Sequence, residues 1–182
     1  MIISPHKAFI SFHHFNDESS KILFEKIFSD YTKAFISTSV NDGDINPALP
    51  TDTIRNKIRD EYLQDSTVTI VLIGSETWKR KHVDWEISSS IRRTKNSSRS
   101  GLLGIILPSY PRQDTSKYNP YTIPPRLYDN IKCGYAKIYN WTTNARSISQ
   151  WIHEAFLRRD SIDPDLSYPM FFNNKSGNQW NY

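Results

Sequence analysis

The chain has 182 residues, and its 23 lysines and arginines against 19 aspartates and glutamates give a net charge of +4. This length fits a single domain of ordinary size. With 37% hydrophobic and 23% charged residues, the composition excludes a disordered polyelectrolyte. The single cysteine, Cys133, excludes an internal disulfide framework and a cysteine-rich zinc site, so we expect no metal.

Basic side chains are concentrated in one part of the sequence. The densest stretch holds Lys79, Arg80 and Lys81, followed by Arg92, Arg93, Lys95 and Arg99. It has two interpretations, a solvated helix face with a loop, or a patch that attracts a small phosphorylated ligand. A charge of +4 is too small to indicate a DNA-binding protein, so no nucleic-acid partner is expected.

Apolar runs are too short for a membrane span. The longest cover residues 68–73 and 102–107, far below the roughly 20 residues that a spanning helix needs. The amino-terminal residues show no basic-plus-apolar signal pattern. We therefore expect a cytoplasmic protein with no membrane partner.

The first elements alternate strand and helix patterns. An apolar run at residues 7–12 predicts a strand, and residues 17–31 carry apolar side chains at helical spacing. Asn16 or Asp17 is the expected N-cap of that helix. A second strand is expected at residues 33–37.

The middle of the chain continues this alternation. A turn-rich loop at residues 40–47 leads to a helix over residues 50–62. The continuous β-branched run at residues 68–73 is typical of a strand covered on both faces. A fourth strand is expected at residues 101–107. The helix between these strands places three apolar residues on one stripe, namely Val83, Ile87 and Ile91.

The last third is less regular. A long loop rich in proline and tyrosine is expected over residues 108–134, followed by a strand at 136–139 and a helix at 143–159. Residues 161–182 show no clear period. We expect one domain over residues 1–160, with a tail that is packed on it or partly disordered.

The alternation predicts an α/β fold, a flavodoxin-like three-layer sandwich whose five-stranded parallel sheet has the order 2-1-3-4-5 and helices on both faces. Such sheets bind ligands at the carboxyl ends of the strands, where the strand order reverses. Here that point lies between the first and third strands. Its residues are Ser11, Phe12, His13 and His14, and residues 74–78.

Two common α/β families do not fit this point. A phospho-acceptor receiver needs an aspartate at the end of the third strand, where this chain has Ile73, Gly74 and Ser75. A dinucleotide-binding fold needs a G-x-G-x-x-G turn after the first strand, and no glycine occurs there.

Four segments, in order, are similar to parts of a TIR domain. They are the opening strand at residues 8–17, the third strand and its turn at 68–78, the glutamate-bearing helix at 79–87 and the fourth strand at 101–107. In detail the chain resembles the TIR-like family that includes the ThsB proteins of Thoeris antiphage systems, over about residues 5–160. It departs from typical TIR domains in the long proline-tyrosine loop and in the tail.

The resemblance implies an enzyme that cleaves NAD between nicotinamide and ribose. TIR-like proteins of this kind make a diffusible NAD-derived messenger that switches on a separate effector. NAD is then a substrate, and no cofactor is implied. The implied partners are an effector of the ThsA kind, a phage-derived trigger and a second copy of the chain. The product stays open between hydrolysed ADP-ribose, a cyclic isomer and an amino-acid conjugate.

The family's catalytic glutamate maps onto Glu86. At ~100° per residue this position lies about 60° from Val83, on the border of the apolar stripe, where a carboxylate is able to reach a cleft. The alternative is an ordinary solvated glutamate paired with Arg93 or Lys79.

The candidate substrate-binding residues are Ser11, Phe12, His13, His14, Ser75, Trp78, Lys79 and Trp85. The aromatic rings are candidates to stack on nicotinamide or adenine, or to lie in the core. The histidines and the serine at position 75 are candidates for ribose or phosphate contacts, and the alternative for the histidines is an exposed loop. Lysine at position 79 is a candidate to attract the pyrophosphate.

Two other functions remain open at this point. A TIR-like domain also serves as a non-enzymatic adaptor, which needs neither Glu86 nor an aromatic pocket. A nucleoside deoxyribosyltransferase-like enzyme shares this type of sheet and uses a glutamate nucleophile, but the acidic residues expected to hold its sugar are not evident.

Overall fold

The computed structural model describes residues 6–28, 34–36, 40–41, 43–63, 65–94 and 97–181. Within them, five parallel strands form one sheet in the order β2-β1-β3-β4-β5. The strands are β1 (Lys7–Ser11), β2 (Ala34–Ile36), β3 (Val68–Ile73), β4 (Gly101–Ile106) and β5 (Ala136–Asn140). The expectation of an α/β fold with a parallel sheet is confirmed.

Helices connect these strands. They are α1 (His14–Phe28), α2 (Thr51–Ile58), α3 (Lys81–Ser90), α4 (Pro125–Lys132) and α5 (Ala145–Ser161), with the short turns η2 (Arg59–Leu63), η3 (Thr77–Lys79) and η4 (Pro120–Thr122). The expected end of the first helix and both ends of the second strand lie outside the described residues. Among those that are described, no helix is both long and apolar enough to cross a membrane.

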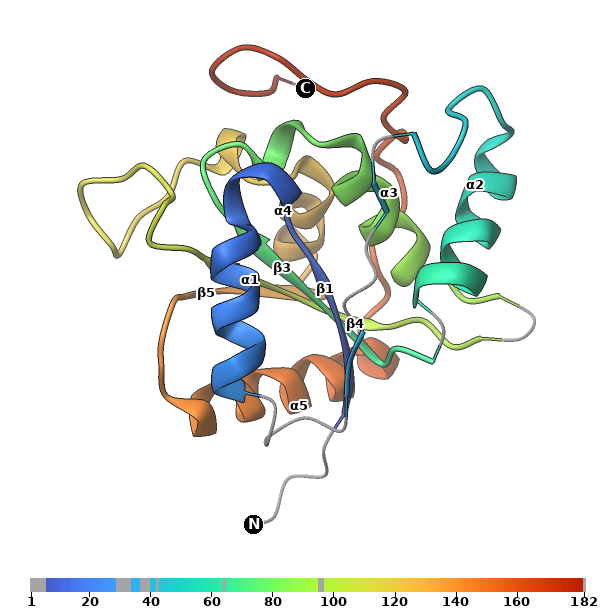
Figure 1. Ribbon diagram of the computed structural model, residues 1–182. Coiled ribbons are helices and arrows are strands. Elements are labelled where there is room, and N and C mark those ends of the chain that lie inside the picture. Colours follow the sequence, from blue (N-terminus) through green and yellow to red (C-terminus); the bar gives the residue numbers. More distant parts are fainter. Residues whose placement is uncertain are drawn as a thin grey trace.

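The sheet is covered on both faces (Figure 1). Helices α1 and α5 pack on one face through Phe24, Phe28 and Ile152, and α3 and α4 pack on the other. Helix α2 lies beside α3 and packs on its Trp85. All six residues of β3 are buried, as its continuous apolar run predicts.

The expectation of one irregular loop over residues 108–134 is wrong, because η4 and α4 lie within it. Proline at the first helical position suits the start of α4, since the missing N–H is not needed there. The helix has only eight residues, and it buries Arg126 and Asn130 beside Leu127. Two turns with polar residues on the buried side carry too little apolar periodicity to be recognised in a sequence.

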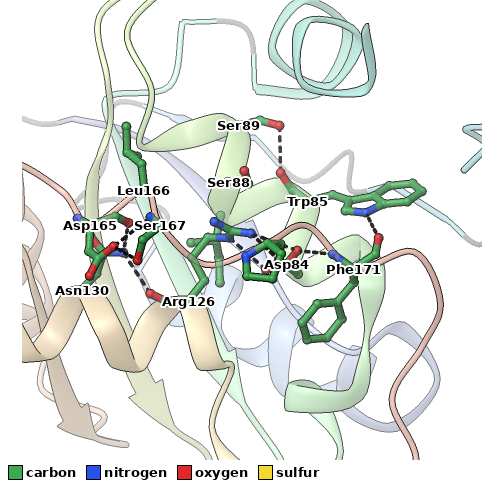
Figure 2. Close-up of polar contacts among 12 residues, drawn as sticks. Asp84, Trp85, Ser88, Ser89, Arg126, Asn130, Asp165, Leu166, Ser167 and Phe171 are labelled. Atoms are coloured by element: carbon green, nitrogen blue, oxygen red, sulfur yellow. Dashed lines mark hydrogen bonds and ion pairs between the residues drawn. The ribbon is translucent and has the colours of Figure 1, made fainter. Parts of the chain in front are cut away.

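The tail is held to α3 and α4 by a buried ion pair (Figure 2). Arg126 Nε lies 2.8 Å from Asp84 Oδ1, and both side chains are almost completely buried. The Phe171 N–H donates to Asp84 Oδ2 at 2.9 Å, and Arg126 Nη2 donates to the Pro169 carbonyl at 3.2 Å. Trp85 Nε1 donates to the Phe171 carbonyl at 2.7 Å. The described part of the tail therefore packs against α3, while the boundary at residue 160 stays a prediction.

We predict that Arg126→Met destabilises the protein strongly. It leaves the Asp84 carboxylate buried without its cation, which costs about 3–5 kcal/mol in the free energy of unfolding. Urea denaturation measures this loss, and limited proteolysis should show earlier cleavage in the tail. Arg93→Met is the matched control, because Arg93 forms an exposed pair with Asp160 and such pairs contribute about 1 kcal/mol or less. Equal losses for the two variants would contradict the assigned role of the buried pair.

Candidate functional site

Glu86 lies where β1, α3 and the segment at Val40 meet. Ser11, the last residue of β1, donates from Oγ to Glu86 Oε2 at 2.5 Å. The Val40 N–H donates to Glu86 Oε1 at 2.9 Å. Glu86 and Ser11 both have 0% exposed surface. The Glu86 carboxylate of α3 is therefore hydrogen-bonded to both β1 and the segment at Val40, at the carboxyl end of the sheet.

The expectation that Glu86 borders a cleft is wrong for this conformation. Every residue of α3 from His82 to Ser90 is buried, because the sheet, α2, α4 and the tail surround the helix. The alternative of a solvated ion pair is wrong as well. Arg93 pairs with Asp160, and Lys79 Nζ lies 2.8 Å from a carboxylate oxygen of Glu76.

A cavity of about 240 Å³ lies near the segments that Glu86 joins, although Glu86 itself does not line it. Its walls come from the neighbours of the three joined segments: His13 and His14 follow Ser11, Asn41 follows Val40, and His82 precedes Glu86 by one helical turn. Its lining residues are His13, His14, Phe15, Asn41, Arg80 and His82. Sequence neighbours of the residues that hold Glu86 thus build the wall of the cavity.

His14 is oriented within this wall. Its Nδ1 lies 2.7 Å from Asn41 Oδ1, and because that oxygen only accepts, Nδ1 carries the proton. Phe12 stacks on the imidazole with ring centroids 4.6 Å apart. Nε2 is buried and has no hydrogen-bond partner among the residues that the structure describes. Nε2 carries no proton in this tautomer, so it is available to accept a hydrogen bond from a hydroxyl group in the cavity.

The remaining candidate residues lie elsewhere. Ser75, Trp78 and Lys79 line a second cavity of about 300 Å³ together with Gly177 of the tail. Trp85 lines neither cavity and packs in the core between α2 and α3. The structure thus brings Ser11 to Glu86 and places His13 and His14 at the first cavity, with Phe12 stacked on His14. It places Ser75, Trp78 and Lys79 at the second cavity.

The segment after Val40 is held by a carboxylate. Asp44 Oδ2 accepts from the Asn41 N–H at 2.8 Å and from Tyr62 Oη at 3.2 Å. The bond from the Asn41 N–H is the main cause that lowers the pKa of Asp44. Burial, and then the charge of Asp44, raises the pKa of Tyr62, and a weaker contribution comes from Glu86. The phenol therefore remains protonated and able to donate.

The sequence did not reveal the position of Asp17. It was expected to cap a helix, but α1 begins earlier, at His14, and Asp17 lies within its first turn. Its buried carboxylate accepts from Ser109 Oγ at 3.2 Å and from Thr77 Oγ1 at 3.4 Å. The carboxylate also contacts Gly74 so closely that a Cβ there would clash with it. Burial raises the pKa of Asp17 above its ordinary value.

The family described as Thoeris protein ThsB, TIR-like domain, matches residues 9–112 of this chain. The chain belongs to the ThsB TIR-like family. The match covers more than half of the chain and includes Ser11, Val40 and Glu86. A search of curated proteins found no match.

Membership in the ThsB TIR-like family indicates a role in antiphage defence, within a system that has partners. It is compatible with NAD processing. The described residues contain no cluster of three or more histidine, cysteine, aspartate or glutamate side chains that could hold a metal ion.

We predict that Asp17→Asn stabilises the protein at neutral pH. The folded-state pKa of Asp17 is raised, so its stabilising contribution is present below the unfolded value near 3.8 and is lost as the pH rises through the folded value. Above that value the buried carboxylate is charged and costs stability, which the amide avoids. Thermal denaturation from pH 7 down to pH 3.5 should show the variant's advantage shrinking as the pH falls. Asp60→Asn, an exposed change, is the control. An advantage independent of pH would contradict the assignment.

Proposed function

We propose that this ThsB-family protein cleaves the bond between nicotinamide and ribose in NAD. The product is an ADP-ribose-derived signal that activates a separate effector of the ThsA kind in a Thoeris-type antiphage system. One observation carries the proposal: Glu86, inside the family match, is held by Ser11 at the carboxyl end of β1, two residues before the His13 and His14 that line a cavity. NAD is the substrate, and no cofactor takes part.

Cleavage of the nicotinamide–ribose bond requires one carboxylate close to the ribose. The bond between ribose C1′ and the pyridinium nitrogen breaks, and its electron pair leaves with nicotinamide, which departs neutral without a general acid. The sugar becomes oxocarbenium-like, as in glycoside hydrolysis. A carboxylate facing that positive charge lowers the barrier. Water or another nucleophile then bonds to C1′ and releases its proton.

The hydrogen bonds that Glu86 accepts can be replaced by hydrogen bonds from a substrate. Its two oxygens accept from a hydroxyl and a backbone N–H, both uncharged donors. A ribose hydroxyl is a donor of the same kind, so it can replace the Val40 N–H with no change in charge balance. The reaction therefore requires the segment at Val40 to move away from the carboxylate.

The cavity also has to grow. Ligand pockets usually measure roughly 300–1,000 Å³, and the histidine-lined cavity of 240 Å³ holds only part of a dinucleotide and does not reach Glu86. We propose that a phage-derived trigger, or assembly with a second copy of the chain, supplies the remaining space. His14 Nε2 and Arg80 would then contact ribose and phosphate.

A second candidate function is a non-enzymatic interaction module. The complete burial of Glu86 favours it, because a carboxylate that joins three segments also has a purely structural use. Helix α1 in addition presents apolar side chains to solvent, with Phe15 94%, Ile22 54% and Leu23 46% exposed. Such a face is able to bind another protein.

The test replaces the proposed catalytic carboxylate with an amide of the same shape. Cells expressing the protein are challenged with phage, and NAD and new ADP-ribose-containing masses are measured by mass spectrometry. We expect Glu86→Gln to lower NAD consumption by about 100-fold or more, as loss of a group that stabilises the transition state does. The amide can still bond to Ser11 and to the Val40 N–H, so the fold should be kept.

Glu18→Gln is the matched control, since Glu18 is exposed on α1 and should leave NAD consumption unchanged. Thermal denaturation of both variants confirms that they are folded. NAD that stays untouched on infection, together with phage protection by a folded Glu86→Gln variant, would replace the enzyme with the interaction module. The mass of any new product decides between hydrolysis, cyclisation and conjugation.

A further inference from the structure

An arginine-lined groove of about 680 Å³ lies at the carboxyl end of α3, the opposite end from His82 and the histidine-lined cavity. Helix α2, the residues after α3 and the beginning of the tail form its walls. Its charged lining residues are Arg55, Arg92, Arg93, Arg99, Asp52 and Asp163. Four arginines against two aspartates leave a net charge of +2 on the groove.

Three of these arginines have carboxylate partners. Arg55 pairs with Asp52 at 3.0 Å, and Arg99 pairs with Asp163 at 2.8 Å. Arg93 pairs with an aspartate of α5. Asp52 and Asp163 are 89% and 94% exposed, whereas the side chains of their arginines are largely covered. Water screens such exposed acids, so the field within the groove remains positive.

Arg92 is the exception. Its Nη2 donates to the Leu166 carbonyl at 3.4 Å, and no described carboxylate forms an ion pair with it. Its Nε is buried without a hydrogen-bond partner in the part of the chain that the structure describes. Burial lowers the pKa of Arg92, and the charges of Arg55 and Arg126 lower it further. The guanidinium nevertheless stays charged, so this wall holds a partly buried positive charge that lacks an anion.

We propose that this groove binds a phosphorylated small molecule through Arg92, with Arg93 as a second contact. The planar guanidinium donates two parallel hydrogen bonds to phosphate oxygens, which would include the unused Nε of Arg92. A volume of about 680 Å³ has room for more than one phosphate group, and Ile91, Pro164 and Leu166 offer an apolar wall for a ribose or a base. A nucleotide fits this combination of charge, size and apolar surface.

A long polyanion fits less well. The two aspartates stand at the groove, and the whole chain carries only +4, which gives a nucleic acid few further contacts. The site does not depend on Glu86 or on NAD cleavage, because it lies at the other end of α3. The basic residues that are close in the sequence are separated in the structure. Arg92, Arg93 and Arg99 line the groove, whereas Lys79 and Arg80 line the cavities of about 300 and 240 Å³.

Isothermal titration calorimetry on the full chain at constant ionic strength tests this site. The probes are inorganic phosphate, pyrophosphate and ADP. We expect ADP and pyrophosphate to bind more tightly than phosphate, and Arg92→Gln to weaken the binding of ADP about tenfold or more, as loss of a bidentate ionic contact does. Arg146→Gln is the matched control, because it removes the same charge from an exposed position on α5, and it should leave affinity unchanged.

Arg93→Gln gives an independent measurement if Arg92→Gln does not fold, since Arg93 is exposed and its loss should still weaken ADP binding about threefold. Three results would each overturn the site. They are no binding of any probe at millimolar concentration, equal weakening by Arg93→Gln and Arg146→Gln, and binding of a single-stranded oligonucleotide without binding of ADP.

Discussion

The structure depends on the complete enclosure of α3, a helix with polar side chains on its buried surface. Buried polar groups are costly unless they are hydrogen-bonded, so each one selects a partner from a neighbouring segment. Asp84 binds Arg126 of α4 and the Phe171 N–H of the tail. Glu86 binds Ser11 of β1 and the Val40 N–H. One helix thereby fixes the positions of the sheet, α4, the tail and the segment at Val40.

Asp84 and Glu86 are two residues apart and equally buried, yet their partners differ in kind. The Asp84 carboxylate is matched by a guanidinium at 2.8 Å, and losing that cation would leave a buried charge. The Glu86 carboxylate accepts from a hydroxyl and a backbone N–H, both of which a sugar hydroxyl can replace. The first arrangement serves stability, and the second suits a group that binds a substrate.

Helix α3 also connects two surfaces of different character. Its amino end borders the histidine-lined cavity, and its carboxyl end borders the arginine groove. Helix α2 packs alongside it, with Arg55 Nε donating to Ser88 Oγ at 3.1 Å, two residues beyond Glu86. The groove and the proposed active site therefore share α3, with α2 packed along it.

The sequence alone determined the parallel α/β fold, the family and the position of Ser11 at the end of the first strand, because strand patterns and motifs are local. The tertiary structure decided the burial of Glu86, the short helix α4, the position of Asp17 and the arginine groove. A helical projection gives the faces of α3 but not what covers them. Arg55 and Arg92 are 37 positions apart in the sequence and come together only because α2 packs on α3. Burial and charge pairing of this kind arise from contacts between distant segments, which no local pattern encodes.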